Sequence, residues 1–197
     1  MKKTFIPVLL LMTLMACRKD ETEIPPPPPP PLPQMMYTDF QNFEAGEDRS
    51  KIFDIDSNGT ADFMFATRLI GDPILMRDRL QFLGFSAISA YVLADPFNNS
   101  LVLNKGASIT SVAPQGFDWF EVQDVLIAEK ITPMHGPVFW EGNWKDASHK
   151  YLPLQVRKEG QIYNGWIELS LDKTKEKLIL HKAGVSKEAG KNVKAGL

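Results

Sequence analysis

YLPLQV (residues 151–156) and WIELSL (residues 166–171) are the stretches that decide the fold, because apolar residues recur at every second position along both. A period of two places successive side chains on opposite faces of an extended chain, so each stretch predicts a strand with one buried face. The side chains expected on these buried faces are Leu152, Leu154 and Val156, and Ile167, Leu169 and Leu171.

Six further segments have the composition of strands and lie between turn residues, whereas no stretch has a long apolar repeat at helical spacing. These segments are residues 51–56, 62–69, 79–85, 87–94, 100–104 and 177–182. Residues 120–130 fit a short helix and a strand equally well. We therefore predict an all-β chain that forms an antiparallel β-sandwich with at most one short helix. A jelly roll is one arrangement that such a sandwich can take.

The first 16 residues have the composition of an export signal, since Lys2 and Lys3 precede an apolar run that ends at Ala16. The run is shorter than the roughly 20 apolar residues that a membrane-spanning helix needs. Residues 14–17 (LMAC) resemble the lipobox of bacterial lipoproteins, in which the cysteine becomes the first mature residue and carries acyl chains. Cys17 is the only cysteine, so it has no disulfide partner in the chain. The resemblance implies a lipid anchor at Cys17; the alternative is an ordinary signal peptide followed by an unrelated cysteine.

The segment after Cys17 has the composition of a tether. Its charged start resembles that of surface-exposed lipoproteins of Bacteroidetes-type Gram-negative bacteria, which implies display at the outer membrane. Residues 25–33 (PPPPPPPLP) predict a polyproline II rod that rises about 3.1 Å per residue and spans roughly 28 Å. We therefore expect a signal peptide at residues 1–16, a lipidated, charged and proline-rich tether at 17–38, and one β-sandwich domain at 39–197.

DIDSNGTAD (residues 54–62) matches loops of the form D-x-D-x-N-G-x-x-D, in which oxygens at alternate positions converge on one calcium ion. The predicted ligands are Asp54, Asp56, Asn58, Thr60 through its carbonyl, and Asp62. Position twelve is Phe65 rather than the glutamate of an EF-hand, so the stretch resembles the calcium loops between strands of extracellular β-proteins. The alternative is a hairpin turn, which needs only Asn58 and Gly59.

The C-terminal third resembles a module of secreted bacterial proteins of unknown function. That module combines an aspartate-rich strand near its start with a YGW-like strand near its end. The matching positions are Tyr151, Leu152, Gly160, Tyr163, Gly165, Trp166 and Ile167, and Pro153 and Asn164 depart from the pattern. The resemblance implies a single β-sandwich module and brings no known activity with it.

The charge of the chain argues against a nucleic-acid partner. The whole chain has a formal net charge of -2, and removal of residues 1–16 leaves 20 Lys and Arg against 24 Asp and Glu, or about -4. Binding to the phosphates of nucleic acid would require a basic face.

The chain contains neither a G-x-S-x-G nor an H-E-x-x-H motif, and His135, His149 and His181 have no Asp or Glu at metal-ligand spacing. A glycosidase requires two carboxylates that face each other, and sequence spacing does not decide which side chains meet. The candidates for such a pair are Asp118, Glu121, Asp124 and Glu141.

Trp140 and Trp144 lie in a segment that contains glycine and asparagine, where aromatic rings can stack on sugars or pack in the core. We therefore expect a membrane-anchored surface lipoprotein with a structural or interaction role and a structural calcium loop, and no enzymatic activity. Its partner would be a polysaccharide or another surface protein. The alternatives are a carbohydrate-binding module and a glycan-active hydrolase.

Overall fold

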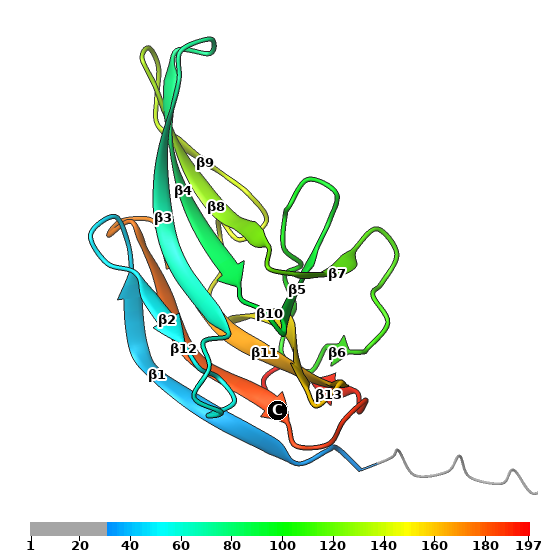
Figure 1. Cartoon of the computed structure of the whole chain (residues 1–197). Helices are drawn as coiled ribbons and strands as arrows, with labels where there is room; N and C mark the ends of the chain where they lie inside the picture. Colours follow the sequence, from blue (N-terminus) through cyan, green and yellow to red (C-terminus); the bar gives the residue numbers. More distant parts are fainter. Residues whose placement is uncertain (1–30) are drawn as a thin grey trace, which may run out of the picture. The chain divides into compact units, whose positions relative to one another are not determined.

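Two antiparallel sheets pack face to face in the computed structural model, which describes residues 31–197 (Figure 1). These residues form one compact unit. The predicted signal peptide, Cys17 and the tether up to residue 30 lie outside the described residues. None of the described segments is a helix long and apolar enough to cross a membrane.

The larger sheet has six strands in the spatial order β1-β12-β11-β10-β5-β7. Their bounds are β1 Met35–Ala45, β5 Ala90–Ala94, β7 Asp118–Glu121, β10 Lys150–Lys158, β11 Gln161–Asp172 and β12 Lys177–Ser186. The consecutive strands β10, β11 and β12 lie side by side as a meander, whereas consecutive strands of a jelly roll mostly alternate between its sheets.

The smaller sheet has five strands in the order β2-β3-β4-β8-β9. Their bounds are β2 Lys51–Phe53, β3 Phe63–Asp72, β4 Arg77–Ser86, β8 Asp124–Pro133 and β9 Phe139–Glu141. A separate pair joins β6 Ser108–Ile109 to β13 Val193–Lys194. The predicted β-sandwich is therefore confirmed.

The structure decides one open alternative and changes two local details. Residues 120–130, which fit a helix and a strand equally well, form the end of β7 and the start of β8, because β4 provides hydrogen-bonding partners along β8. Residues 100–104 make only isolated bridges, among them Leu103 with Tyr151. The domain begins before residue 39, since β1 starts at Met35, which pairs with Ser186 of β12.

The main core lies between the two sheets, and the residues predicted to face it do so. Leu152, Leu154, Ile167 and Leu169 have no exposed surface and pack in the same cluster as Phe65 and Phe82 of the smaller sheet. Burial of aromatic and branched side chains of this size contributes about 1.5 to 3 kcal/mol each to the free energy of folding. The alternation read from the sequence therefore identifies the inner face of the larger sheet.

The outer face of the same sheet is also covered in part. Trp166 points away from the main core but has no exposed surface, because it packs in a second cluster with Tyr151, Ile109 and Val193. Ile109 belongs to β6 and Val193 to β13, so the C-terminal segment, together with β6, covers this part of β11.

Gly165 should tolerate no side chain, because a Cβ there would lie 2.5 Å from the carbonyl oxygen of Gly184 and 2.9 Å from Leu154 Cδ1. We expect Gly165→Ala to destabilise the domain by about 1 to 3 kcal/mol, since backbone and packed core must shift. Gly71→Ala is the matched control, because its Cβ would be 3.6 Å from the nearest heavy atom, Asp78 Oδ1. Urea unfolding of both variants measures their loss in free energy of unfolding, and equal losses in the two variants would contradict this prediction.

Candidate functional site

The loop at residues 54–62 connects β2 to β3 and is longer than a tight hairpin turn. Phe53 pairs with Phe63, and the N–H of Asp62 donates to the carbonyl of Phe53 over 2.9 Å, so nine residues are enclosed. Ser57 and Gly59 have positive φ angles of 55° and 86°, which reverse the chain inside the loop. A two-residue Asn-Gly hairpin turn, the alternative interpretation of this stretch, is therefore not what forms.

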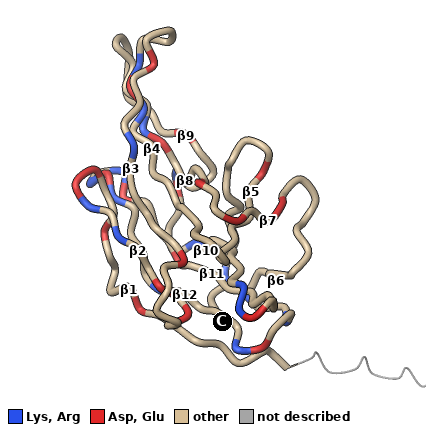
Figure 2. The backbone as a smooth tube through the Cα atoms, viewed as in Figure 1, with Lys and Arg blue, Asp and Glu red and all other residues tan. Residues whose placement is uncertain are grey.

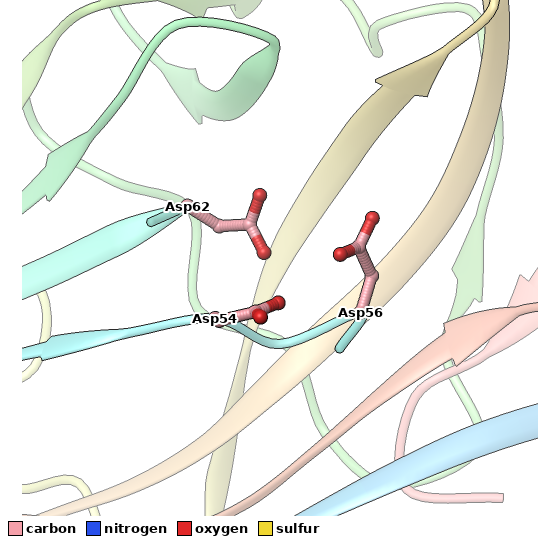
Figure 3. Close-up of side chains that lie close together, drawn as sticks. All are labelled: Asp54, Asp56 and Asp62. Atoms are coloured by element: carbon pink, nitrogen blue, oxygen red, sulfur yellow. The ribbon is translucent and has the colours of Figure 1, made fainter. Parts of the chain in front are cut away.

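Three carboxylates converge in this loop (Figure 3). Asp54, Asp56 and Asp62 each offer an oxygen, and these oxygens lie within 4.8 Å of one another. Asp56 and Asp62 are buried, at 5% and 2% exposed, whereas Asp54 is half-buried. The spacing predicted from the sequence thus brings the three aspartates together.

Backbone N–H groups of the loop hold the carboxylates in place. Asp54 Oδ2 accepts from the N–H of Gly59 over 2.7 Å, and Asp62 Oδ2 accepts from the N–H of Ile55 over 2.8 Å. Asn58 Nδ2 donates to Asp56 Oδ2 over 3.0 Å, while Asn58 Oδ1 accepts from the N–H of Thr60 over 2.6 Å. The side-chain oxygen of Asn58 therefore also accepts a hydrogen bond within the loop, and Thr60 is exposed. Ligation by Asn58 and by the Thr60 carbonyl stays a prediction.

Lys158 is the cation that approaches the cluster. Its Nζ lies 2.9 Å from Asp56 Oδ2, and the Asp56 side chain has no exposed surface. Lys158 ends β10, so this ion pair joins the loop of the smaller sheet to the larger sheet. Lys158 was not among the predicted site residues, because no local pattern indicates which lysine reaches a distant loop.

The surroundings shift the pKa values of Asp62 and Asp54 in opposite directions. Burial raises the pKa of Asp62 to about 6, and repulsion from Asp56 and Asp54 adds to this effect despite the hydrogen bond from Ile55. Burial also raises the pKa of Asp54, but hydrogen bonds from Gly59 and Asn58 outweigh it and lower this pKa below the ordinary value. Grouped carboxylate oxygens of this kind suit a hard divalent cation, which would neutralise the charge left by one lysine.

Trp140 and Trp144, the candidates for stacking on sugars, pack against the core. Trp144 has no exposed surface, and its Nε1–H donates to Ser100 Oγ over 2.8 Å. Trp140 is half-buried and packs against Phe82, with 5.7 Å between ring centroids. Trp140 and Trp144 therefore do not form an exposed pair of rings, and the predicted glycan-stacking surface is corrected to core packing, complete for Trp144 and partial for Trp140.

Two of the candidate catalytic carboxylates are held in ion pairs. Glu121 lies 2.8 Å from Arg157, and Asp124 lies 3.6 Å from Arg68. These contacts provide a structural role for both carboxylates.

A group of exposed apolar side chains lies at a different place, on the loops of the β3–β4 and β8–β9 hairpins. Both hairpins project from the sandwich (Figure 1). We call residues 73–76 and 134–138 the hairpin tip. Ile74 is 90% exposed, Met134 66% and Leu75 58%. The N–H of Met134 donates to the carbonyl of Met76 over 2.8 Å, so the two loops form one surface.

Charged residues lie on the strands below the hairpin tip, whereas the ends of both loops carry none (Figure 2). Arg77 lies 3.5 Å from Asp72, and Arg79 lies 2.8 Å from Glu129, so these arginines are paired with acids. The sequence contains a signal for this surface, although no prediction was based on it. The turn residues Gly71, Asp72 and Pro73 are followed directly by three apolar residues, which a tight turn cannot bury.

Comparison of the chain with protein-family models, with curated proteins and with solved structures found no match.

Without metal, Asp62→Asn should stabilise the domain at neutral pH. The folded pKa of Asp62, about 6, lies above the unfolded value of about 3.9, so the wild type loses stability as the pH rises from about 4 to 6. An asparagine keeps an acceptor for the Ile55 N–H and carries no charge. In EDTA, we expect the free energy of unfolding of the variant to equal that of the wild type near pH 4 and to exceed it by on the order of 2 kcal/mol at pH 7.5. Urea unfolding measures both values.

Asp95→Asn is the matched control. Burial raises the pKa of Asp95, but hydrogen bonds from Asn99 and Phe97 outweigh it and lower the pKa. The same substitution should therefore lower stability at pH 7.5. A stability difference for Asp62→Asn that does not change with pH would contradict the electrostatic account.

Proposed function

We propose that this chain is a lipid-anchored cell-surface protein that binds a partner protein through its hairpin tip, with calcium bracing the loop at residues 54–62. The observation that carries the proposal is the cluster of exposed apolar side chains at the tip, led by Ile74, Met134 and Leu75. Exposed apolar groups that gather at one place on a soluble domain are typical of interaction sites.

The charges beside the tip favour a protein, rather than a membrane, as its partner. Arg77 and Arg79, on the strand below the tip, are each paired with an acid, so they leave no surplus of positive charge for anionic lipid headgroups.

The anchor itself is supported by the sequence. The lipobox-like residues 14–17 end in the single cysteine of the chain, and a proline-rich stretch follows. Each buried acyl methylene contributes about 0.8 kcal/mol to membrane binding, so several chains on Cys17 would hold the protein without a spanning helix.

The calcium site is supported by the chemistry of the carboxylates. Asp54, Asp56 and Asp62 present oxygens within 4.8 Å of one another, and burial together with repulsion from Asp56 and Asp54 raises the pKa of Asp62. An ion bound there would lower the repulsion and fix the connection between β2 and β3. Sites of this type in extracellular modules bind calcium with dissociation constants of about 10⁻⁴ to 10⁻³ M.

Calcium at 10 mM should therefore raise the unfolding midpoint of residues 31–197 by several degrees at pH 7.5. A ligand that binds only the folded state stabilises by RT ln(1 + [L]/Kd), or about 1.4 to 2.7 kcal/mol for such dissociation constants. The shift should disappear in Asp62→Asn and persist in Asp95→Asn. Thermal unfolding in calcium and in EDTA measures it, and coincident wild-type curves would remove calcium from the proposal.

A photo-crosslinking amino acid at position 74 should capture a discrete protein partner on intact cells. The matched position is Phe97, which is 83% exposed and lies outside the tip, and which should give no such product. Met134→Asp should abolish the product formed at position 74 without lowering the unfolding midpoint, since this side chain is exposed. Binding of the domain to phospholipid vesicles through the tip, without a protein crosslink, would contradict the proposal.

A further inference from the structure

A second group of polar side chains lies on the outer face of the larger sheet, where three adjacent strands lose their regular register. The β1–β12 pairing shifts between Asp39 and Phe43, and the β11–β12 pairing shifts between Ile167 and Leu169. Both irregularities lie opposite His181 of β12. Bulges of this kind redirect side chains and occur often beside active sites.

The backbone is strained around the same position. Gln41 and Asn42 have positive φ angles of 55° and 54°, and His149 has one of 49°. Non-glycine residues adopt this conformation uncommonly and at a cost in free energy, and they are enriched at functional sites. The side chains of Asn42 and His149 both contact His181.

Ser170, His181 and Asn42 form a continuous chain of hydrogen bonds. Ser170 Oγ lies 2.8 Å from His181 Nε2, and His181 Nδ1 lies 2.6 Å from Asn42 Oδ1. Because an amide oxygen can only accept, the proton of a neutral His181 ring is on Nδ1, and Nε2 accepts from the serine hydroxyl. This is the arrangement of a nucleophile, a base and a residue that orients the base.

The groups around His181 keep its ring neutral, as a general base requires. Burial lowers the pKa of His181, and the neighbouring His149 lowers it further, while Glu168 opposes the shift, so the ring is neutral at pH 7. The His149 ring stacks on the His181 ring, with 4.2 Å between centroids, and its Nδ1 lies 2.8 Å from Glu168 Oε1. The N–H of His149 donates to Ser170 Oγ over 2.8 Å. One lone pair of this oxygen is thereby used, and a second is left for attack on a substrate.

We propose that Ser170, His181 and Asn42 form a site that cleaves carboxylic esters, with Ser170 as the nucleophile, His181 as the general base and Asn42 as the positioning residue. Ser170 Oγ bonds to the acyl carbon while its proton passes to His181 Nε2. The bond from the acyl carbon to the leaving alcohol then breaks, and the alcohol oxygen takes this proton. Water attacks the acyl-serine and gives a proton to His181, which returns it to Ser170 Oγ as the free acid leaves.

The exposure of these residues indicates the class of ester. The His149 side chain is 62% exposed and Asn42 is exposed, whereas Ser170 itself is only 9% exposed. A large molecule can therefore approach this sheet face, but only a small acyl group that projects from it, such as an acetyl group on an esterified polysaccharide, would reach Ser170 Oγ.

A fluorophosphonate probe tests the nucleophile directly on the full chain, purified in mild detergent. We expect covalent labelling at Ser170, located by mass spectrometry of the labelled peptide, and a fall of at least about 100-fold in its rate in His181→Gln. Ser148→Ala is the matched control, since this exposed serine lies next to His149 and should not affect labelling. The proposal would be overturned if Ser170 were labelled no faster than Ser148, or if the labelling rate of Ser170 were unchanged in His181→Gln.

Hydrolysis of p-nitrophenyl acetate tests the positioning role of Asn42. Asn42→Ala should lower kcat and leave KM unchanged, and Asn42→Asp should restore kcat, because a carboxylate also accepts from His181 Nδ1–H. Asn42 is exposed, so neither substitution removes a packed side chain. Equal rates in wild type and Asn42→Ala, or no recovery in Asn42→Asp, would exclude this role.

Discussion

Coverage of both faces of β11 is the constraint on which the rest of this structure depends. The inner face buries Ile167 and Leu169 against the smaller sheet, and the outer face buries Trp166 beneath β6 and β13. A Cβ at Gly184 would lie 2.8 Å from the Trp166 ring, so the close contact of the indole with β12 requires a glycine there. Glu168 and Ser170 follow on the same outer face, at 8% and 9% exposed. The outer face of β11 is thus buried beyond Trp166, at the polar group around His181.

The loop at residues 54–62 depends on a different balance, between burial and charge. Two buried carboxylates and a half-buried third lie together, Lys158 pairs with one of them, Asp56, and burial with repulsion from its neighbours raises the pKa of Asp62 to about 6. A divalent cation in place of the Asp62 proton would bring the summed charge of the three carboxylates and Lys158 to zero at the pH of most extracellular fluids. The same loop can therefore be stable in acid without metal and at neutral pH with it.

Alternation along the chain predicted the inner face of the larger sheet correctly, because a period of two depends only on strand geometry. Leu152, Leu154, Ile167 and Leu169 are all fully buried. The same reasoning could not place Trp166 or Trp144, whose burial depends on the C-terminal segment and on a loop after β9. The sequence also grouped Asp54, Asp56 and Asp62 correctly, since all three lie in one short loop. Contacts between segments far apart in the sequence, such as Lys158 with Asp56 or His149 with His181, carry no local signal.

The most direct test of the proposed function is the accessibility of the hairpin tip on living cells. A cysteine at position 74, and separately one at position 97, would be treated with a membrane-impermeant maleimide on intact cells and as purified protein. If the proposed function holds, labelling at position 97 is fast in both cases, because the proposal displays the domain on the surface, and labelling at position 74 is slow on cells only, because the proposed partner would cover the tip. Equal labelling of position 74 on cells and in purified protein would contradict a docked tip, and protection of both positions on cells would contradict surface display.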